Sequence, residues 1–152
     1  MIRSRGAPPP LDAPGSLQDP MILVTTSRKA DPLVRRIGRD IAFATGGRYL
    51  TRGKGGLTTP PFSDGKVLVL SRDRNGVQME VLDEMREVTC LRFRSVKEED
   101  REGPLKRGLF TGDDALLTCL SPHLPVIREE GLPHTLVLDG VQGRRVSLEA
   151  GP

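Results

Sequence analysis

The chain has 152 residues, with 23 Lys and Arg against 20 Asp and Glu and a formal net charge of +3. This length suits a single domain, or two small halves packed together, with room for a sizeable core. No apolar run approaches the roughly 20 residues that a membrane-spanning helix needs, and the N-terminus lacks the apolar core of a secretory signal. We therefore expect a cytoplasmic protein without a membrane partner.

Residues 1–20 are rich in Pro and Gly, and we expect a mobile tail there. Residues 21–26 are apolar and β-branched, which predicts a buried strand. Asp31 and Pro32 then predict a helix start, because Asp accepts hydrogen bonds from free backbone N–H groups and Pro lacks an N–H that would need a partner. The pair Gly46-Gly47 predicts the end of this helix, whose core-facing stripe consists of Leu33, Ile37 and Ile41.

A second strand is predicted at residues 48–51, followed by a cationic glycine loop at residues 52–56. From residue 21 to residue 66, nine Lys and Arg stand against three acids, a local net charge of +6. Because this is twice the charge of the whole chain, the positive charge is concentrated in one segment. Such a concentration indicates a polyanionic partner.

Two motifs flank the predicted helix: TTSRK at residues 25–29 and YLTRGK at residues 49–54. In this combination they resemble the Brix domain of ribosome-biogenesis proteins, in particular its short archaeal members. The resemblance implies a non-enzymatic, RNA-associated factor that acts on ribosomal RNA or pre-rRNA, with other ribosome-assembly proteins as possible partners and no cofactor. It also implies an α/β fold with a mixed sheet, flanking helices and two similar halves that resemble anticodon-binding domains.

Outside that segment the chain matches the family only loosely. The family pattern has a helix after the second motif, whereas Pro60 and Pro61 disfavour any regular element in residues 53–65. Strands are predicted at residues 66–71 and 77–82, joined by a hairpin turn at Asn75-Gly76, and again at residues 88–96.

The second half is predicted with the order helix, strand and hairpin. A helix is expected at residues 113–120, with Thr111 or Asp113 as its N-cap, and an extended segment at residues 124–128. Residues 135–138 and 146–148 form the hairpin, and Arg144 and Arg145 lie in its turn. We expect one domain over residues 21–152, with halves at about 21–97 and 104–150, and the acidic residues 98–102 as a solvated linker between them.

The candidate RNA-binding residues are hydroxyls and cations from the basic segment. Residues 26–29 lie beside the helix N-terminus, where the helix dipole favours an anion. The glycine loop at residues 52–56 offers cations and backbone N–H groups. With one Tyr and no Trp, base stacking has few platforms, which favours phosphate contacts. The candidates are Thr26, Ser27, Arg28, Lys29, Arg35, Arg36, Arg39, Arg52 and Lys54. The alternatives are a helix-capping turn, helix arginines that are solvated or neutralised by Asp40, and a loop without a ligand.

Two other functions stay open: a protein-interaction scaffold in ribosome assembly, and a small enzyme that handles nucleotides with the loop at residues 53–56. Against the enzyme, Lys54 is followed by Gly rather than the Ser or Thr of a phosphate loop. No catalytic residues or metal ligands are assigned. Cys90 and Cys119 are expected to be buried free thiols, with a disulfide as the alternative.

Overall fold

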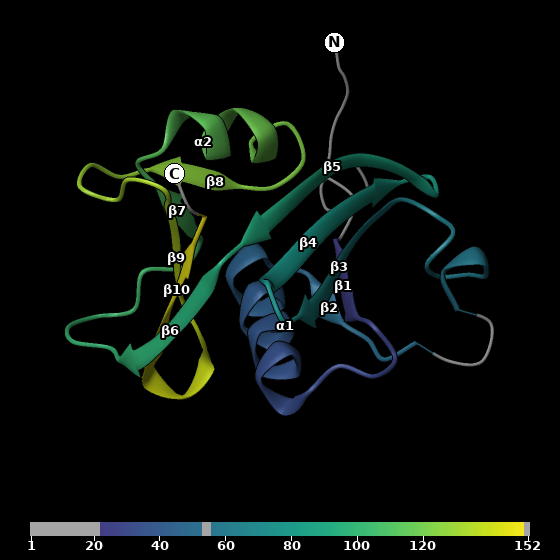
Figure 1. Ribbon diagram of the computed structural model, residues 1–152, viewed down its shortest axis with the longest axis horizontal. Helices are drawn as coiled ribbons and strands as arrows, with labels where there is room; N and C mark the ends of the chain where they lie inside the picture. The colour runs from purple at the N-terminus through teal and green to yellow at the C-terminus, as the bar shows by residue number, and fades with distance from the viewer. Residues whose placement is uncertain (1–21, 53–55, 151–152) are drawn as a thin grey trace, which may run out of the picture.

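The computed structural model describes residues 22–52 and 56–150 (Figure 1). The predicted tail therefore lies outside the described residues. The α/β class is confirmed. In chain order the elements are β1 (Leu23–Thr26), α1 (Pro32–Thr45), β2 (Arg48–Tyr49), the short 3-10 turn η1 (Gly56–Thr58), β3 (Lys66–Asp73), β4 (Gly76–Asp83), β5 (Arg86–Phe93), β6 (Ser95–Asp100), β7 (Leu109–Thr111), α2 (Asp114–Leu120), β8 (Val126–Arg128), β9 (Thr135–Asp139), the 3-10 turn η2 (Val141–Gly143) and β10 (Arg144–Glu149).

The strands form two sheets of mixed pairing. The first has the order β2-β1-β3-β4-β5, with β1 parallel to both of its neighbours and the remaining pairs antiparallel. The second has the order β6-β10-β9-β7-β8, with only β7 and β8 parallel. The predicted mixed pairing is thus confirmed, in two sheets rather than one.

The two sheets repeat one spatial order. The run β1-α1-β2-β3-β4 of the first sheet corresponds to β7-α2-β8-β9-β10 of the second. The edge position next to β4 is taken by β5, and the equivalent position next to β10 is taken by β6. One direction differs, because β3 runs parallel to β1 whereas β9 runs antiparallel to β7. This arrangement agrees with the two similar halves expected from the sequence.

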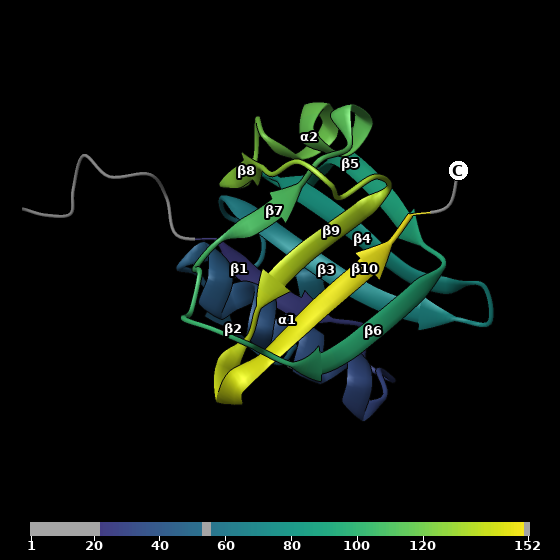
Figure 2. The same ribbon diagram turned by 90° about the vertical axis from the view of Figure 1, so that its left-hand side faces the viewer.

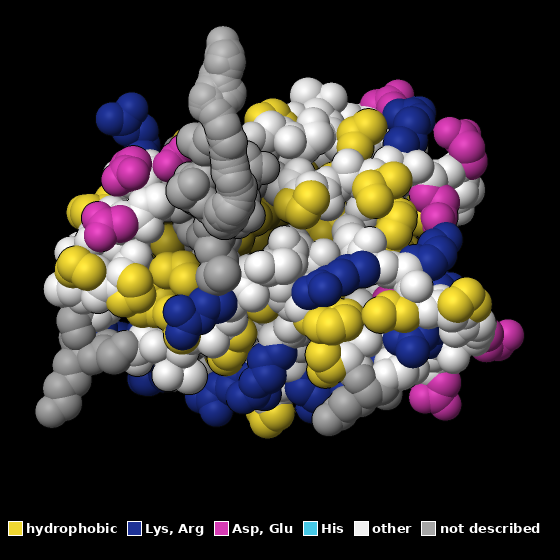
Figure 3. Space-filling view, turned by 180° about the vertical axis from the view of Figure 1, so that it is seen from behind, with side chains coloured by type: hydrophobic (Ala, Val, Ile, Leu, Met, Phe, Trp, Pro, Cys, Tyr) yellow, Lys and Arg dark blue, Asp and Glu magenta, His cyan; other side chains and the backbone are white. Residues whose placement is uncertain are grey.

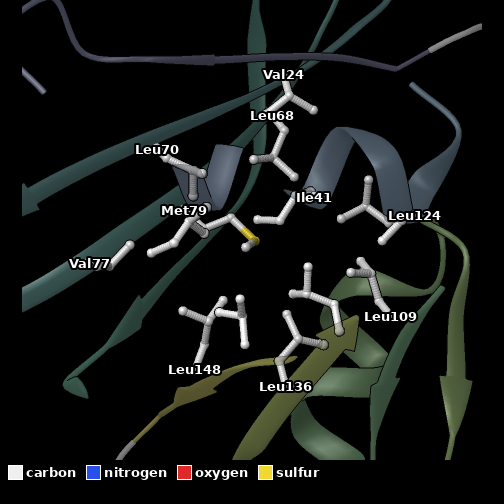
Figure 4. Packing of buried hydrophobic residues seen from close by; sticks show 14 of the residues in the cluster. Val24, Ile41, Leu68, Leu70, Val77, Met79, Leu109, Leu124, Leu136 and Leu148 are labelled. Atoms are coloured by element: carbon white, nitrogen blue, oxygen red, sulfur yellow. The ribbon is translucent and has the colours of Figure 1, made fainter. Parts of the chain in front are cut away.

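Helix α1 lies between the two sheets and packs on strands of both (Figure 2). Figure 4 shows the side chains that meet there: Met79 of the first sheet and Ile41 of the helix lie between Leu68 of the first sheet and Leu136 and Leu148 of the second. All five belong to one buried cluster. The halves therefore share a single core.

The local signals of the helices and the hairpin are confirmed. Asp31 caps α1 by accepting from Val34 N at 3.0 Å, and the left-handed Gly46 ends the helix at φ 75°. Asp113 caps α2 in the same way, through Leu116 N. β3 and β4 form the predicted hairpin, but its turn residues are Arg74 and Asn75, one position before the predicted Asn75-Gly76, and Gly76 is the first residue of β4.

The solvated linker predicted at residues 98–102 is wrong. Most of it belongs to β6, the edge strand of the second sheet, where Asp100 pairs with Arg144 and Glu99 with Arg145 in register. Opposite charges directly across a strand pair stabilise it, so an acidic run forms a strand here. Arg144 and Arg145 accordingly begin β10 and do not lie in the predicted turn.

Residues 56–65 contain only the turn η1 and no α-helix, as their prolines predict. Phe62 and Leu57 of this segment pack on Val67 and Val69, on the side of the first sheet that faces away from α1. An irregular segment therefore covers this side of the first sheet.

Both cysteines are free, but the prediction that they are buried is wrong, because Cys90 is exposed and Cys119 half-buried. Cys90 lies on the edge strand β5, and side chains alternate along a strand, so Phe93 faces the core while Cys90 faces away. Over the described residues, neither helix is long and apolar enough to cross a membrane.

Candidate nucleic-acid interface

The carboxyl end of β1 leads into a short polar turn. Ser27 N donates to Leu70 O at 2.9 Å, which extends the pairing with β3, and Ala30 N donates to Ser27 O at 3.1 Å, which closes the turn. Arg28 and Lys29 lie at the tip of this turn and are exposed. The sequence-predicted cations are therefore held on an ordered support at the start of α1.

Thr26 lies at the centre of the contacts that organise this surface. Its side chain is 6% exposed, its carbonyl oxygen accepts from Arg52 Nε at 3.2 Å, and its hydroxyl lies 3.4 Å from the Tyr49 hydroxyl. The Tyr49 ring in turn lies under the Arg39 guanidinium, 5.2 Å from its centroid. Gly38 makes room for this ring, because a Cβ there would stand 2.8 Å from Tyr49 Cε1.

The outward ridge of α1 carries Arg35, Arg39 and Phe43, which are spaced four residues apart and so share one face. Arg107, from the loop before β7, joins this ridge. It donates from Nε to Phe43 O at 2.8 Å and lies over the Phe43 ring at 4.7 Å. A cation at a helix C-terminus interacts favourably with the helix dipole, so Arg107 extends the positive ridge to the end of α1.

The one acid of α1, Asp40, does not neutralise this ridge. It is fully buried and faces the second sheet, where both of its carboxylate oxygens accept from Arg144. Within residues 22–52 and 56–150, neither Arg35 nor Arg39 forms an ion pair. Asp40 therefore forms no ion pair with Arg35 or Arg39.

Arg36 differs from its neighbours. Its Nε and Nη2 donate to the two carboxylate oxygens of Glu98 on β6, at 3.3 and 3.1 Å. These hydrogen bonds and the nearby negative charge of Glu98 raise the pKa of Arg36. Arg36 thus connects α1 to the second sheet and is the least available of the candidate cations.

We call the resulting surface the basic face. It joins the end of β1, the edge strand β2 and the ridge of α1. In Figure 3, Lys and Arg side chains gather along the lower middle of the view, while most Asp and Glu side chains lie near its margins. The basic face consists of Arg28, Lys29, Arg35, Arg39, Arg52 and Arg107.

Sequence reasoning missed Arg107. Arg107 reaches α1 only through the tertiary fold, so no local signal marks it. The predicted Lys54 lies outside the described residues, as does most of its glycine loop. After that loop the chain continues through η1 into β3, so the strand–loop–helix order of a phosphate loop is not formed. No group of His, Cys, Asp and Glu suited to a metal ion occurs among the residues that the structure describes.

Comparison with solved structures identifies proteins that share this fold. No family model matches the chain, and no curated protein matches its sequence. Among solved structures, Mil, an archaeal Imp4-like protein, superposes with a TM-score of 0.58 and 21% identity, over 84% of this chain and 95% of that one. The chain has the Imp4-like fold.

A probable ribosomal biogenesis protein from Aeropyrum pernix K1 also shares this Imp4-like fold, with a TM-score of 0.52 and 19% identity, over 86% of this chain and 96% of that one. Imp4 is a Brix-domain protein, so the resemblance found in the sequence is confirmed at the level of the fold. Nearly the whole length of both solved structures is matched, which includes both sheets of this chain.

Proposed function

We propose that this protein is a non-catalytic ribosome-assembly factor of the cytoplasm that binds ribosomal RNA through the basic face. The observation that carries the proposal is the ridge of α1, which presents Arg35, Arg39 and the stacked Arg107 while its acid is turned into the core. A surface of one sign of charge attracts a polyanion, and RNA phosphates are the polyanion of the ribosome. The shared fold with a probable ribosomal biogenesis protein supports the same role.

The predicted site residues take different parts in this proposal. Arg28, Lys29, Arg35 and Arg39 are exposed and contact phosphates, and Ser27 belongs to the same surface. Lys54 stays a candidate from the sequence, outside the described residues. Thr26 is buried and positions Arg52 and Tyr49, and Arg36 holds α1 against β6. The protein would hold an RNA segment by neutralising its phosphates and would break no bond.

The experiment compares two matched pairs of charge deletions. Arg28→Ala/Lys29→Ala removes two cations from the basic face, whereas Arg86→Ala/Arg128→Ala removes two exposed cations elsewhere. Ribosomal RNA fragments are titrated with wild type and both variants at two salt concentrations. The basic-face variant should bind more weakly, with a salt slope lower by about 0.7 to 0.9 for each phosphate that the variant no longer neutralises, and the control should match wild type.

Equal binding by all three proteins, or no RNA binding by any of them, contradicts the proposal. Capture of another ribosome-assembly protein that does not change with salt, without RNA binding, would favour the scaffold function instead. A control for folding is the unfolding midpoint of each variant, which should stay close to that of wild type because all four side chains are exposed.

A further inference from the structure

A second basic site lies where the β3–β4 turn meets the junction of β5 and β6. A cavity of about 140 Å³ opens there between the two sheets. Three arginines, one acid, one hydroxyl and three apolar side chains line it: Arg72, Arg74, Arg94, Asp73, Ser95, Leu33, Val77 and Val96. None of these residues was among the candidates from the sequence.

The arginines of this cavity are available to an anion. Arg74 has no ion pair or hydrogen bond with any residue in the described ranges. Arg72 pairs with Asp31 at 3.1 Å and Arg94 with Glu149 at 3.3 Å, and all four side chains are more than 40% exposed. Exposed pairs of this kind are weak, so a phosphate can replace the carboxylates as the partner of the guanidinium groups.

The one acid in the lining, Asp73, does not prevent an anion from binding. Asp73 accepts from Arg92 Nη1 with both carboxylate oxygens, at 3.0 Å each, and from Asn75 N at 2.8 Å. Its charge is therefore compensated by Arg92, which lies outside the cavity lining. Arg72 and Arg94 are likewise paired, with Asp31 and Glu149, so the unbalanced positive charge of the lining is that of Arg74.

The apolar side chains of the lining are held in place by packing on the core. Val77 is buried, and Leu33 and Val96 are half-buried and pack on the shared core. An apolar wall beside arginine side chains suits a flat heterocycle, because guanidinium planes stack on nucleobases that have left a helix. A phosphate site next to an apolar wall has the chemistry of a nucleotide.

The cavity is continuous with the basic face. Asp31, the N-cap of α1, pairs with Arg72 at the cavity and follows Arg28 and Lys29 within the same turn. An RNA strand that follows the basic face past the start of α1 therefore reaches the cavity beside Asp31, whose carboxylate is paired with Arg72.

We propose that this cavity takes one unpaired nucleotide of the bound RNA, with its base against Leu33 and Val96 and its phosphate on Arg74 and Arg94. The inference rests on the proposed function and adds to it a preference for RNA that carries an unpaired nucleotide, such as a bulge. A fully paired segment offers phosphates to the basic face but no free base to the cavity.

The test uses two RNA hairpins that share one compact tetraloop with stacked bases and differ only in a single bulged nucleotide of the stem, with the ¹⁵N-labelled full chain observed by NMR. On addition of the bulged hairpin, the amides of Gly76 and Ser95 at the cavity and of Arg35 and Tyr49 at the basic face should all shift. The paired hairpin should shift only the second pair. Wild type should bind the bulged hairpin several times more tightly, because its unpaired base buries apolar surface against Leu33 and Val96.

Arg74→Ala/Arg94→Ala should remove that preference and the Gly76 and Ser95 shifts, while Arg86→Ala/Arg128→Ala should retain both. Arg74→Ala alone, at an exposed turn position, is the second variant if the pair does not fold. If the basic-face amides shift and the cavity amides do not, the inference fails and the proposed function stands. If no amide shifts with either hairpin, both fail.

AMP is titrated separately to distinguish a nucleotide of RNA from a free mononucleotide. The inference predicts that the bulged hairpin displaces AMP from the cavity. If AMP shifts Gly76 and Ser95 and the hairpin does not compete with it, the cavity serves a free nucleotide and the inference is overturned.

Discussion

Asp40 in α1 and Arg144 at the start of β10 form a buried ion pair, with 2.9 Å between Oδ2 and Nη2. Asp40 also accepts from Val141 N at 3.2 Å, so its carboxylate is satisfied although it is fully buried. The pair fastens α1 to the second sheet. It also keeps the one acid of α1 away from the basic face, and thereby links the shared core to the charge of the proposed RNA surface.

Asp40→Ala should lower the free energy of unfolding by about 3 kcal/mol, because it leaves the largely buried Arg144 without its main partner. Urea unfolding measures this loss. Glu130→Ala is the control, because it removes an acid from the exposed pair with Arg128 and should have little effect. Similar small losses for both variants would show that the buried pair does not hold α1 in place.

Gly140→Ala should also destabilise the protein, by about 1 to 3 kcal/mol through overpacking. A Cβ on Gly140 would stand 2.4 Å from Asp40 Cγ, and the φ of Gly140 is −94°, which Ala adopts freely. The destabilisation therefore comes from the steric clash and not from the backbone.

A double-mutant cycle isolates that clash. In an Asp40→Ala background the carboxylate is gone, so Gly140→Ala should cost much less than in wild type. Strictly additive losses in urea unfolding would contradict the close approach of Gly140 and Asp40.

The N-cap of α2 predicts a pH-dependent stability. The hydrogen bond from Leu116 N, helped by those from His134 N and Ala115 N, lowers the pKa of Asp113. The cap therefore stabilises the fold fully above the ordinary Asp pKa of about 3.9 and loses this contribution as the pH falls through the lowered value. Asp113→Ala should cost about 1 kcal/mol near neutral pH and progressively less under acid conditions. Urea unfolding over that pH range checks this, and a loss that does not change with pH would be inconsistent with an ionised cap.

The structure also makes the reactivity of Cys90 predictable. Partial burial, followed by the carboxylates of Glu87 and Glu80, raises the pKa of the Cys90 thiol. Since the thiolate is the reactive form, alkylation at mildly basic pH should be slower than for an unperturbed thiol. In a Cys119→Ser background, Glu87→Gln should accelerate it, and an unchanged or slower rate would contradict the electrostatic cause.

The sequence predicted those elements whose ends are determined by residues close together in the chain. Asp31, Pro32 and Gly46 fix the ends of α1 within its own residues, and Asn75-Gly76 indicates a hairpin whose strands adjoin it. β6 could not be recognised, because its acidic residues are stabilised by Arg144 and Arg145, more than 40 positions away.

The same limit applies to the site. Local charge in the sequence located the end of β1 and the ridge of α1 correctly as places rich in cations. Only the fold shows that Arg36 is held by Glu98, that Asp40 is turned inward and that Arg107 joins Phe43. These three relationships depend on contacts between α1 and the second half, and no pattern within the segment encodes them.

Tyr49 provides the most direct test of the central claim that RNA binds at the basic face. It is the single tyrosine of a chain without tryptophan, and it lies under Arg39, so its fluorescence reports on this surface alone. The measurement is Tyr49 emission during titration with a ribosomal RNA fragment at two salt concentrations, for wild type and Arg28→Ala/Lys29→Ala. We predict a saturable change in emission that weakens with salt, with a slope lower in the variant by about 0.7 to 0.9 for each phosphate that it no longer neutralises. RNA that binds without changing Tyr49 emission, and with the same slope in both proteins, would contradict binding at the basic face.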